Sequence, residues 1–305
     1  MKKVARNLFF PLGIVLVLSM LSVPKLEKSL WAAAPALGNI HDIPNSADGK
    51  IFQQLVEYGE ETQLDQVSMG QIVQSIAHQL LNSEYKAGLL DQFSQETLVV
   101  SLRQFDCLLF IENVLAIANN IATKNHSYQA YTKNLENQRY WGGKINGYCS
   151  RLHYFSDWIK DNQKRGNIRN ITTELGSIKI TKKLDFMTTH RQSYKNLAKN
   201  DTNFKCIARV EQSLSPDFNY IPTKDIRQTY SGLESGDIVG VATNIPGLDF
   251  THTGFVYRQS NGKVGLIHAS PAGKVVIAQD LQNYIGNVDN AIGIVVSRAN
   301  KPKQQ

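Results

Sequence analysis

Apolar residues recur at helical spacing in two segments of the first half of the chain. Over 68–83 they fall on one face, and Ser68 with Gln71 forms a capping box. A second apolar stripe begins at Cys107 and continues at positions 110, 111, 114, 115 and 118, with Asp106 as a favoured N-cap. The pattern predicts a helix over 68–83, a short strand at 97–102 and a helix beginning at Cys107.

The pattern changes after Gly236. Short runs rich in Val and Ile, separated by Gly, Asn and Pro, indicate an antiparallel meander with strands at 238–243, 253–258, 263–269, 274–278 and 291–298. Between the two halves, polar loops alternate with aromatic clusters, and a helix is predicted near 151–162. A helical first half followed by a sheet indicates an α+β protein.

Residues 1–36 have the order of a secretory signal peptide. Basic residues come first, an apolar stretch follows over 8–21, and small residues lead to a predicted cleavage site after Ala36. An uncleaved N-terminal anchor is the alternative. We interpret 37–48 as a linker, and 37–305 as a single domain with a long insertion at about 125–230.

The leader changes how the net charge is interpreted. The full chain has a net charge of +7. Residues 1–36 hold five basic residues and one acidic residue, a net +4, so the chain without the leader has a net charge of +3. This charge is too small to indicate nucleic acid as a partner. The sequence contains no H-E-x-x-H or comparable ligand cluster and no nucleotide signature, so we expect neither a metal nor a cofactor.

The chain has three cysteines, and three cannot all pair. Either Cys149 and Cys206 form a disulfide and leave Cys107 free, or all three are thiols. Cys107 is predicted at the first residue of a helix, where free backbone N–H groups and the macrodipole favour a thiolate. It also lies on the apolar stripe, so a buried core thiol is the alternative to a nucleophile.

His252 and His268 are candidates for a general base and its orienting partner, because they lie on consecutive predicted strands. A two-residue turn at Asn261-Gly262 would make paired residue numbers sum to 523, which places the rings on opposite faces. An odd-length loop centred on Ser260 makes them sum to 520, and His252 then stands directly opposite His268, about 5 Å away at Cβ. We predict the odd-length loop.

These residues belong to six segments that occur in order over about residues 100–298: FDCLLFIE, RLHYFSDWI, DFMTTH, SGDIVGVAT, GLDFTHTGF and LIHAS. Together they resemble the DUF1460 family, the N-acetylmuramoyl-L-alanine amidase-like branch of the NlpC/P60 papain-like superfamily. The chain departs from the general superfamily pattern at Leu108, where many members carry a small residue, and in its long insertion. The resemblance implies a papain-like fold whose cysteine helix packs on the C-terminal antiparallel sheet.

The resemblance further implies a thiol hydrolase without a cofactor. Cys107 would attack an amide carbonyl, His252 would take and return the proton, His268 would orient His252, and Asp106 would support the cysteine by capping its helix. The expected substrate is peptidoglycan or muropeptide fragments, cut at the N-acetylmuramoyl-L-alanine amide, by a protein exported to the periplasm or cell envelope. A stem-peptide endopeptidase of NlpC/P60 type and a non-catalytic wall-binding module are the alternatives.

The insertion and one later loop supply candidate substrate-binding residues, because arginine and aromatic side chains suit a carboxylated peptide joined to an amino sugar. The alternative for the insertion segment is a surface helix with two aromatic side chains tucked beneath it. The candidates are Arg151, His153, Tyr154, Asp157 and Asp249.

Overall fold

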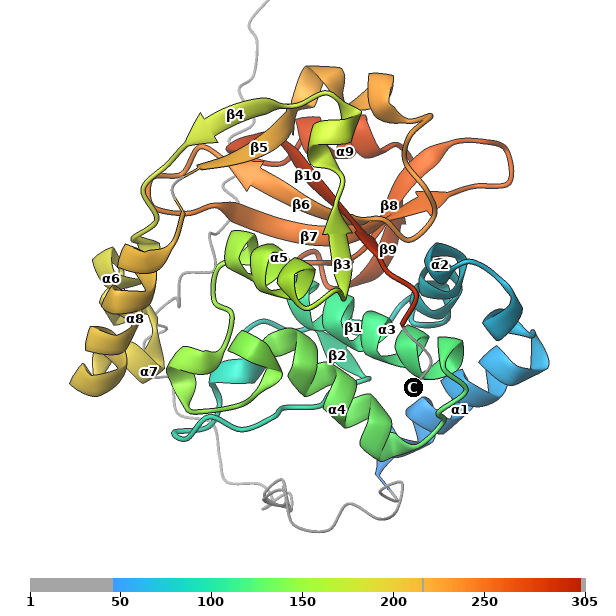
Figure 1. Cartoon of the computed structure of the whole chain (residues 1–305), viewed down its shortest axis with the longest axis horizontal. Coiled ribbons are helices and arrows are strands. Elements are labelled where there is room, and N and C mark those ends of the chain that lie inside the picture. Colours follow the sequence, from blue (N-terminus) through green and yellow to red (C-terminus); the bar gives the residue numbers. More distant parts are fainter. Residues whose placement is uncertain (1–45, 216, 303–305) are drawn as a thin grey trace, which may run out of the picture.

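The computed structural model describes residues 46–215 and 217–302 (Figure 1). The predicted signal peptide and its cleavage site lie outside these residues. The described chain is an α+β structure, in which helices pack on a large mixed sheet, so the α+β part of the predicted fold class is confirmed.

The helices of the first half begin where local capping signals place them. Helix α2 (Met69–Gln79) carries the predicted capping box, and α3 (Cys107–Ala122) begins at the predicted residue, with Asp106 Oδ1 accepting a hydrogen bond from Leu109 N at 2.8 Å. Helix α1 (Ala47–Glu61) was not predicted. It begins inside the segment interpreted as a linker, because the Ser46 hydroxyl caps it by accepting from Gly49 N.

The C-terminal strands form the centre of the sheet. Antiparallel neighbours follow in chain order through β6 (Ile238–Thr243), β7 (Phe250–Arg258), β8 (Val264–Ser270) and β9 (Lys274–Ala278), as the meander predicts. The last strand, β10 (Ala291–Ala299), does not extend this meander beyond β9. It returns to the far side of β6 and pairs antiparallel with it.

The sheet is wider than the sequence predicts, with ten strands in the described ranges. Its further strands are β1 (Glu84–Tyr85), β2 (Gln104–Phe105), β3 (Ile168–Asn170), β4 (Ile178–Thr181) and β5 (Asp217–Pro222). The last three come from the predicted insertion, and both β3 and β5 pair with β10. This segment is therefore built into the edge of the sheet.

The strand predicted at 97–102 does not form. Its backbone groups are bonded by side chains from elsewhere, because Leu102 N donates to Asp48 Oδ1 at 2.8 Å and Val99 O accepts from Arg139 Nη1 at 2.6 Å. Such contacts satisfy the main chain without a β ladder. The short strand β2 follows two residues beyond the predicted one.

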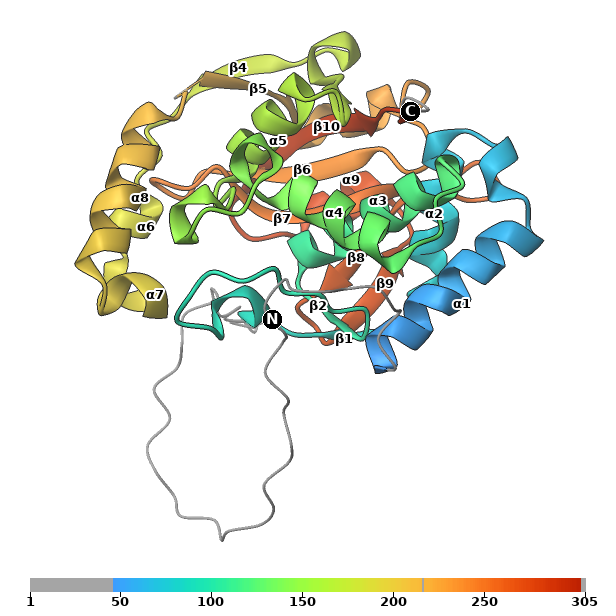
Figure 2. The same ribbon diagram turned by 60° about the horizontal axis from the view of Figure 1, so that its bottom comes forward.

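The remaining helices lie mostly in the insertion. They are α4 (Tyr128–Arg139), α5 (Phe155–Lys164), α6 (Phe186–Thr189), α7 (Lys195–Ala198), α8 (Asp201–Ser213) and, between β9 and β10, α9 (Leu281–Gly286). Short 3-10 turns are η1 (Leu64–Gln66), η2 (Leu89–Asp91), η3 (Trp141–Gly143), η4 (Tyr148–Ser150), η5 (Thr172–Leu175), η6 (Arg191–Ser193) and η7 (Thr223–Thr229). Figures 1 and 2 both place α6, α7 and α8 together at one end of the molecule.

The helix predicted near 151–162 begins four residues late. Arg151 forms an isolated β-bridge with Tyr140, and Leu152 N donates to Arg139 O at 2.9 Å, so this stretch is extended before α5 starts at Phe155. Residues 151–154 therefore belong to an extended segment that precedes α5, and their side chains do not lie on a helix face.

The sheet separates two apolar cores. One face packs against α3, with Phe110 contacting Phe255 of β7 edge to face at 5.8 Å between ring centroids. The opposite face packs against α9. There Leu281 and Ile285 join one apolar cluster with Val256, which follows Phe255 in β7 and so points to the other side of the sheet. Among the described residues, no helix is long and apolar enough to cross a membrane.

The structure decides between the two cysteine arrangements. Cys149 and Cys206 form a disulfide with their Cα atoms 6.2 Å apart, and Cys107 is a free, half-buried thiol. The bridge joins η4 to α8 across a sequence separation of 57 residues.

Replacing both bridged cysteines, by Cys149→Ser with Cys206→Ser, is expected to lower the free energy of unfolding by roughly 4 kcal/mol, because a closed loop of this length restricts the unfolded chain. Urea unfolding followed by circular dichroism measures the change. Wild-type protein in a strong reductant should show the same loss, and an unchanged midpoint in both samples would contradict a stabilising bridge.

Candidate active site

His252 and His268 meet on one face of the β7–β8 hairpin. His252 Nε2 lies 2.8 Å from His268 Nδ1, and the two rings are nearly perpendicular with centroids 4.8 Å apart. Both side chains are buried. The sequence-based expectation that the two rings share a face is therefore met.

The hairpin register differs from the predicted one by two residues. Pairs such as Phe255 with Ile267 sum to 522, so the loop is odd in length, as predicted, but spans 259–263 and is centred on Asn261. The Asn261 side chain accepts from Lys263 N at 3.0 Å, which fixes that centre. His252 therefore reaches His268 diagonally and not from directly opposite.

Gly254 makes room for this diagonal contact. It precedes Phe255 in β7, and a Cβ at this position would lie only 3.0 Å from His268 Cβ. Real Cβ atoms rarely come so close, so a larger residue would push His268 away from His252. A glycine is needed here for space between the strands.

Cys107 lies at the first turn of α3, against the strand that carries His252. Polar groups of Thr253, the residue after His252, face the thiol and lower its pKa. Burial and the nearby charge of Asp106 act in the opposite direction and more strongly, so the pKa of Cys107 is raised to about 11. The expected thiolate is not the resting form, because desolvation outweighs the helix terminus.

The resting site is uncharged at its three candidate catalytic groups. Burial lowers the pKa of His252 to about 3, with the neighbouring His268 adding to the shift, and burial lowers the pKa of His268 to about 4. Both imidazoles are thus neutral at pH 7 and retain a lone pair. In the described part of the chain, the Cys107 thiol makes no hydrogen bond to either ring, a contact that often tightens only when substrate binds.

Tyr284 of α9 was not predicted from the sequence and completes the surroundings of the histidine pair. Its hydroxyl lies 3.5 Å from His268 Nδ1, and its ring centroid is 4.6 Å from that of His268. Burial raises the pKa of Tyr284, so its hydroxyl stays protonated. Helix α9 has only six residues, too few for a periodic pattern to indicate this role.

A cavity of about 190 Å³ opens at the start of α3, and its lining within the described ranges does not include Cys107, His252 or His268. Asp106 and Leu108, the residues on either side of the cysteine, line it. Three of the five candidate substrate-binding residues line the same cavity, namely Arg151, His153 and Tyr154. The structure therefore brings these three to the start of α3, where Asp106 and Leu108 flank the cysteine.

The other two candidates lie elsewhere. Asp157 borders a separate groove on α5, where burial raises the pKa of its carboxyl to about 7. Asp249 is 1% exposed, and its carboxylate accepts from Ser156 N and Phe250 N, both at 2.8 Å. It fixes the start of α5 and does not face the cavity.

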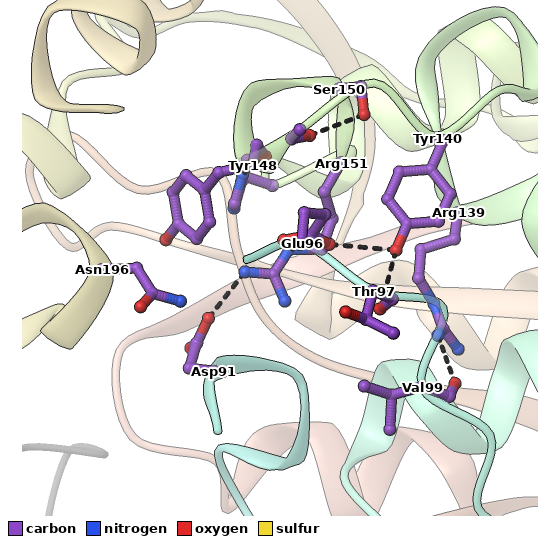
Figure 3. A network of polar contacts seen from close by, with 12 residues as sticks. Asp91, Glu96, Thr97, Val99, Arg139, Tyr140, Tyr148, Ser150, Arg151 and Asn196 are labelled. Carbon is purple, nitrogen blue, oxygen red and sulfur yellow. Dashed lines mark hydrogen bonds and ion pairs between the residues drawn. The ribbon is translucent and has the colours of Figure 1, made fainter. Parts of the chain in front are cut away.

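Charged side chains surround the cavity in a network that Figure 3 shows in part. Arg139 pairs with Glu112 at 2.6 Å, and both are buried. Arg151 pairs with Asp91 at 2.6 Å and approaches Glu96 at 3.5 Å. These partners are 27 to 60 residues apart in the sequence, so no local motif reveals them. Nowhere in the described ranges do three or more His, Cys, Asp or Glu side chains form a group suited to a metal ion.

Comparison with known families matches residues 75–294 to the AmiA-like family, described as N-acetylmuramoyl-L-alanine amidase-like. The chain belongs to this family. Its match covers both the cysteine helix and the hairpin of the two histidines, and membership supports hydrolase activity on an amide bond.

Solved structures agree with this assignment. An N-acetylmuramoyl-L-alanine amidase from Bacteroides uniformis is 32% identical, with a TM-score of 0.72 over 76% of this chain and 99% of that chain. A Bacteroides fragilis protein described as a putative xylanase is also 32% identical, with a TM-score of 0.66 over 73% of this chain and 98% of that one. A Legionella pneumophila protein of the DUF1460 family shares the fold at 21% identity, with a TM-score of 0.63 over 84% and 96%. A search of curated proteins found no match to the chain.

The buried histidines of this AmiA-like protein predict a loss of stability in mild acid. Their pKa values lie below the unfolded value of about 6.5, so below that pH the unfolded chain binds protons that the folded chain does not. His153 behaves in the same way, since burial and then the charge of Arg151 lower its pKa to about 3. The free energy of unfolding should therefore fall as pH drops from about 6.5 towards 4.

The variant His153→Gln isolates the contribution of His153 to this loss of stability, because glutamine can keep the hydrogen bond to Tyr148 O without titrating. Between pH 7 and pH 5 its stability should fall by roughly 2 kcal/mol less than that of the wild type, the contribution of one suppressed proton. Urea unfolding at the two pH values measures the difference. Equal losses in both proteins would show that His153 titrates normally.

Proposed function

We propose that this chain is an exported cysteine amidase that hydrolyses the N-acetylmuramoyl-L-alanine bond of peptidoglycan through Cys107, His252 and His268. The observation that carries the proposal is the hydrogen bond between the two buried histidines, together with a free thiol at the start of α3. The thiol faces Thr253, one residue from His252. Membership in the AmiA-like family supports the substrate class.

In the proposed mechanism each nitrogen of His252 has a separate role. Because His252 Nε2 bonds to His268 Nδ1, the Nδ1 atom of His252 is the one left to serve as the base. A neutral imidazole has one N–H, and donation of Nε2–H to His268 holds His252 in the tautomer whose Nδ1 carries a lone pair. His268 would thus orient His252 and stabilise its protonated form.

Acylation would begin as Cys107 Sγ attacks the amide carbonyl and its proton passes to His252 Nδ1. The backbone N–H of Cys107, free at the helix start, would help to hold the oxyanion. As the C–N bond breaks, His252 returns the proton to the departing amine. The product is a thioester on Cys107 and the freed amino group of the stem peptide.

Deacylation would reverse the roles. A water molecule gives a proton to His252 and attacks the thioester carbonyl. The C–S bond breaks, and the sulfur regains the proton from His252, so the thiol and the neutral imidazole are restored. Since the resting thiol is protonated, with its pKa raised to about 11, proton transfer must accompany attack rather than precede it.

Loss of the nucleophile tests this mechanism. Cys107→Ala should reduce hydrolysis of purified muropeptides by at least about 10³-fold while leaving the circular dichroism spectrum unchanged. His252→Ala should have a comparable effect, with His190→Ala as the matched control because His190 is exposed on a different segment. Mass spectrometry of the products identifies the bond that is cut.

The products also separate the alternatives. Cleavage inside the stem peptide would favour an NlpC/P60-type endopeptidase, and wall binding without any cleavage would favour a binding module. Xylan serves as a control substrate because of the description of the B. fragilis neighbour. Full activity of Cys107→Ala would refute the cysteine mechanism.

His268 is tested as a positioning residue by comparing two replacements. His268→Ala should lower kcat by roughly 10²-fold or more, because His252 loses the group that fixes its tautomer. His268→Asn should lose less, since its amide oxygen can accept the same hydrogen bond. Steady-state kinetics over pH 5–9 measures both, and equal losses would argue that His268 acts only by filling space.

A further inference from the structure

Arg151 and Asp91 form an unequal ion pair at the cavity that opens at the start of α3. The side chain of Arg151 is 5% exposed, whereas that of Asp91 is 38% exposed, and the two meet at 2.6 Å. Both residues line the cavity. The guanidinium is therefore fixed in the wall, and the carboxylate reaches it from the solvent side.

Arg151 has buried contacts besides the one with Asp91. Its guanidinium lies 4.9 Å from the centre of the Tyr148 ring, and the buried carboxylate of Glu96 is 3.5 Å from its Nε. Glu96 is itself held by the Tyr140 hydroxyl at 2.9 Å, as Figure 3 shows. The buried Nε of Arg151 faces Glu96 in this ion pair and makes no hydrogen bond within the described ranges.

Asp91 stands at the exposed end of a short turn. It ends the short turn η2, which follows Gly88 in a left-handed conformation with φ +74 and precedes a stretch without regular structure. Leu89 of this turn packs into the core, and the ion pair with Arg151 is what holds the Asp91 side chain itself at the cavity wall. A carboxylate placed in this way can leave the guanidinium at low conformational cost.

We propose that Asp91 occupies the place of a substrate carboxylate, and that a free carboxylate on the peptide of the substrate displaces it from Arg151. This inference rests on the proposed function, because it assigns a peptide-binding role to the cavity of the same site. The exchange conserves charge, since one carboxylate replaces another at the same guanidinium. Arg151 is the specificity-determining residue in this arrangement.

The other charges of the cavity leave Arg151 as the available cation. Arg139 is buried and paired with Glu112, and Asp106 caps α3. The volume of about 190 Å³ accommodates a group of amino-acid size, roughly six water molecules by volume. A planar guanidinium binds a carboxylate through two parallel hydrogen bonds, which a carboxamide cannot reproduce.

The test compares two muropeptides that differ only in one stem carboxylate, free in one and amidated in the other. Wild-type kcat/KM should be roughly tenfold or more higher for the free acid. Asp91→Asn removes the internal competitor, so its KM for the free acid should fall several-fold, while its KM for the amidated substrate changes little. Arg151→Gln should lose the preference altogether.

Glu174→Gln is the matched control, because it opens an exposed ion pair with Arg169 outside the cavity, and it should behave as wild type. Calorimetric binding of both muropeptides to Cys107→Ala reads the same preference without turnover. A protein that hydrolyses both substrates equally well, or an Asp91→Asn variant that raises KM for both alike, overturns the exchange but not the amidase. Absence of hydrolysis with binding that still prefers the free acid would instead count against the proposed reaction alone.

Discussion

The position of the proposed catalytic groups depends on the packing of α3 against one face of the sheet. Phe110, on the first turn of that helix, contacts Phe255 of β7, and the same strand carries His252 three residues earlier. Because Phe110 and Phe255 are both buried, a shift of the helix along the strand would open cavities in a closely packed core. This packing holds the thiol against Thr253 without any direct bond between helix and histidines.

Local signals explain which parts of the structure could be predicted. Asp106 caps α3 through a contact three residues away, so the sequence alone places Cys107 at the helix start. His252 and His268 share a face because the loop between their strands has an odd number of residues, and this follows from the alternation of side chains along a strand. The exact register was missed because the Asn261 side chain, and not strand composition, sets the centre of the loop.

Long-range contacts explain the rest. The pairing of β3 and β5 with β10, and of Arg151 with Asp91, joins residues far apart in sequence, and neither is marked by a motif. Arg139 likewise gains its partner only when α4 packs beside α3. Burial also reversed the expected ionisation of Cys107, because a sequence indicates helix termini but not how much water remains around them.

The disulfide has a further consequence for how the protein is made. Three thiols allow three single pairings, and only the bond between Cys149 and Cys206 leaves Cys107 reduced. During oxidation of the newly made chain, either of the other pairings would capture the reactive sulfur. Early formation of α3, whose contacts with α2 and α4 are close in sequence, would shelter that sulfur before α8 docks. The proposed mechanism therefore requires that oxidation join Cys149 to Cys206 and spare Cys107.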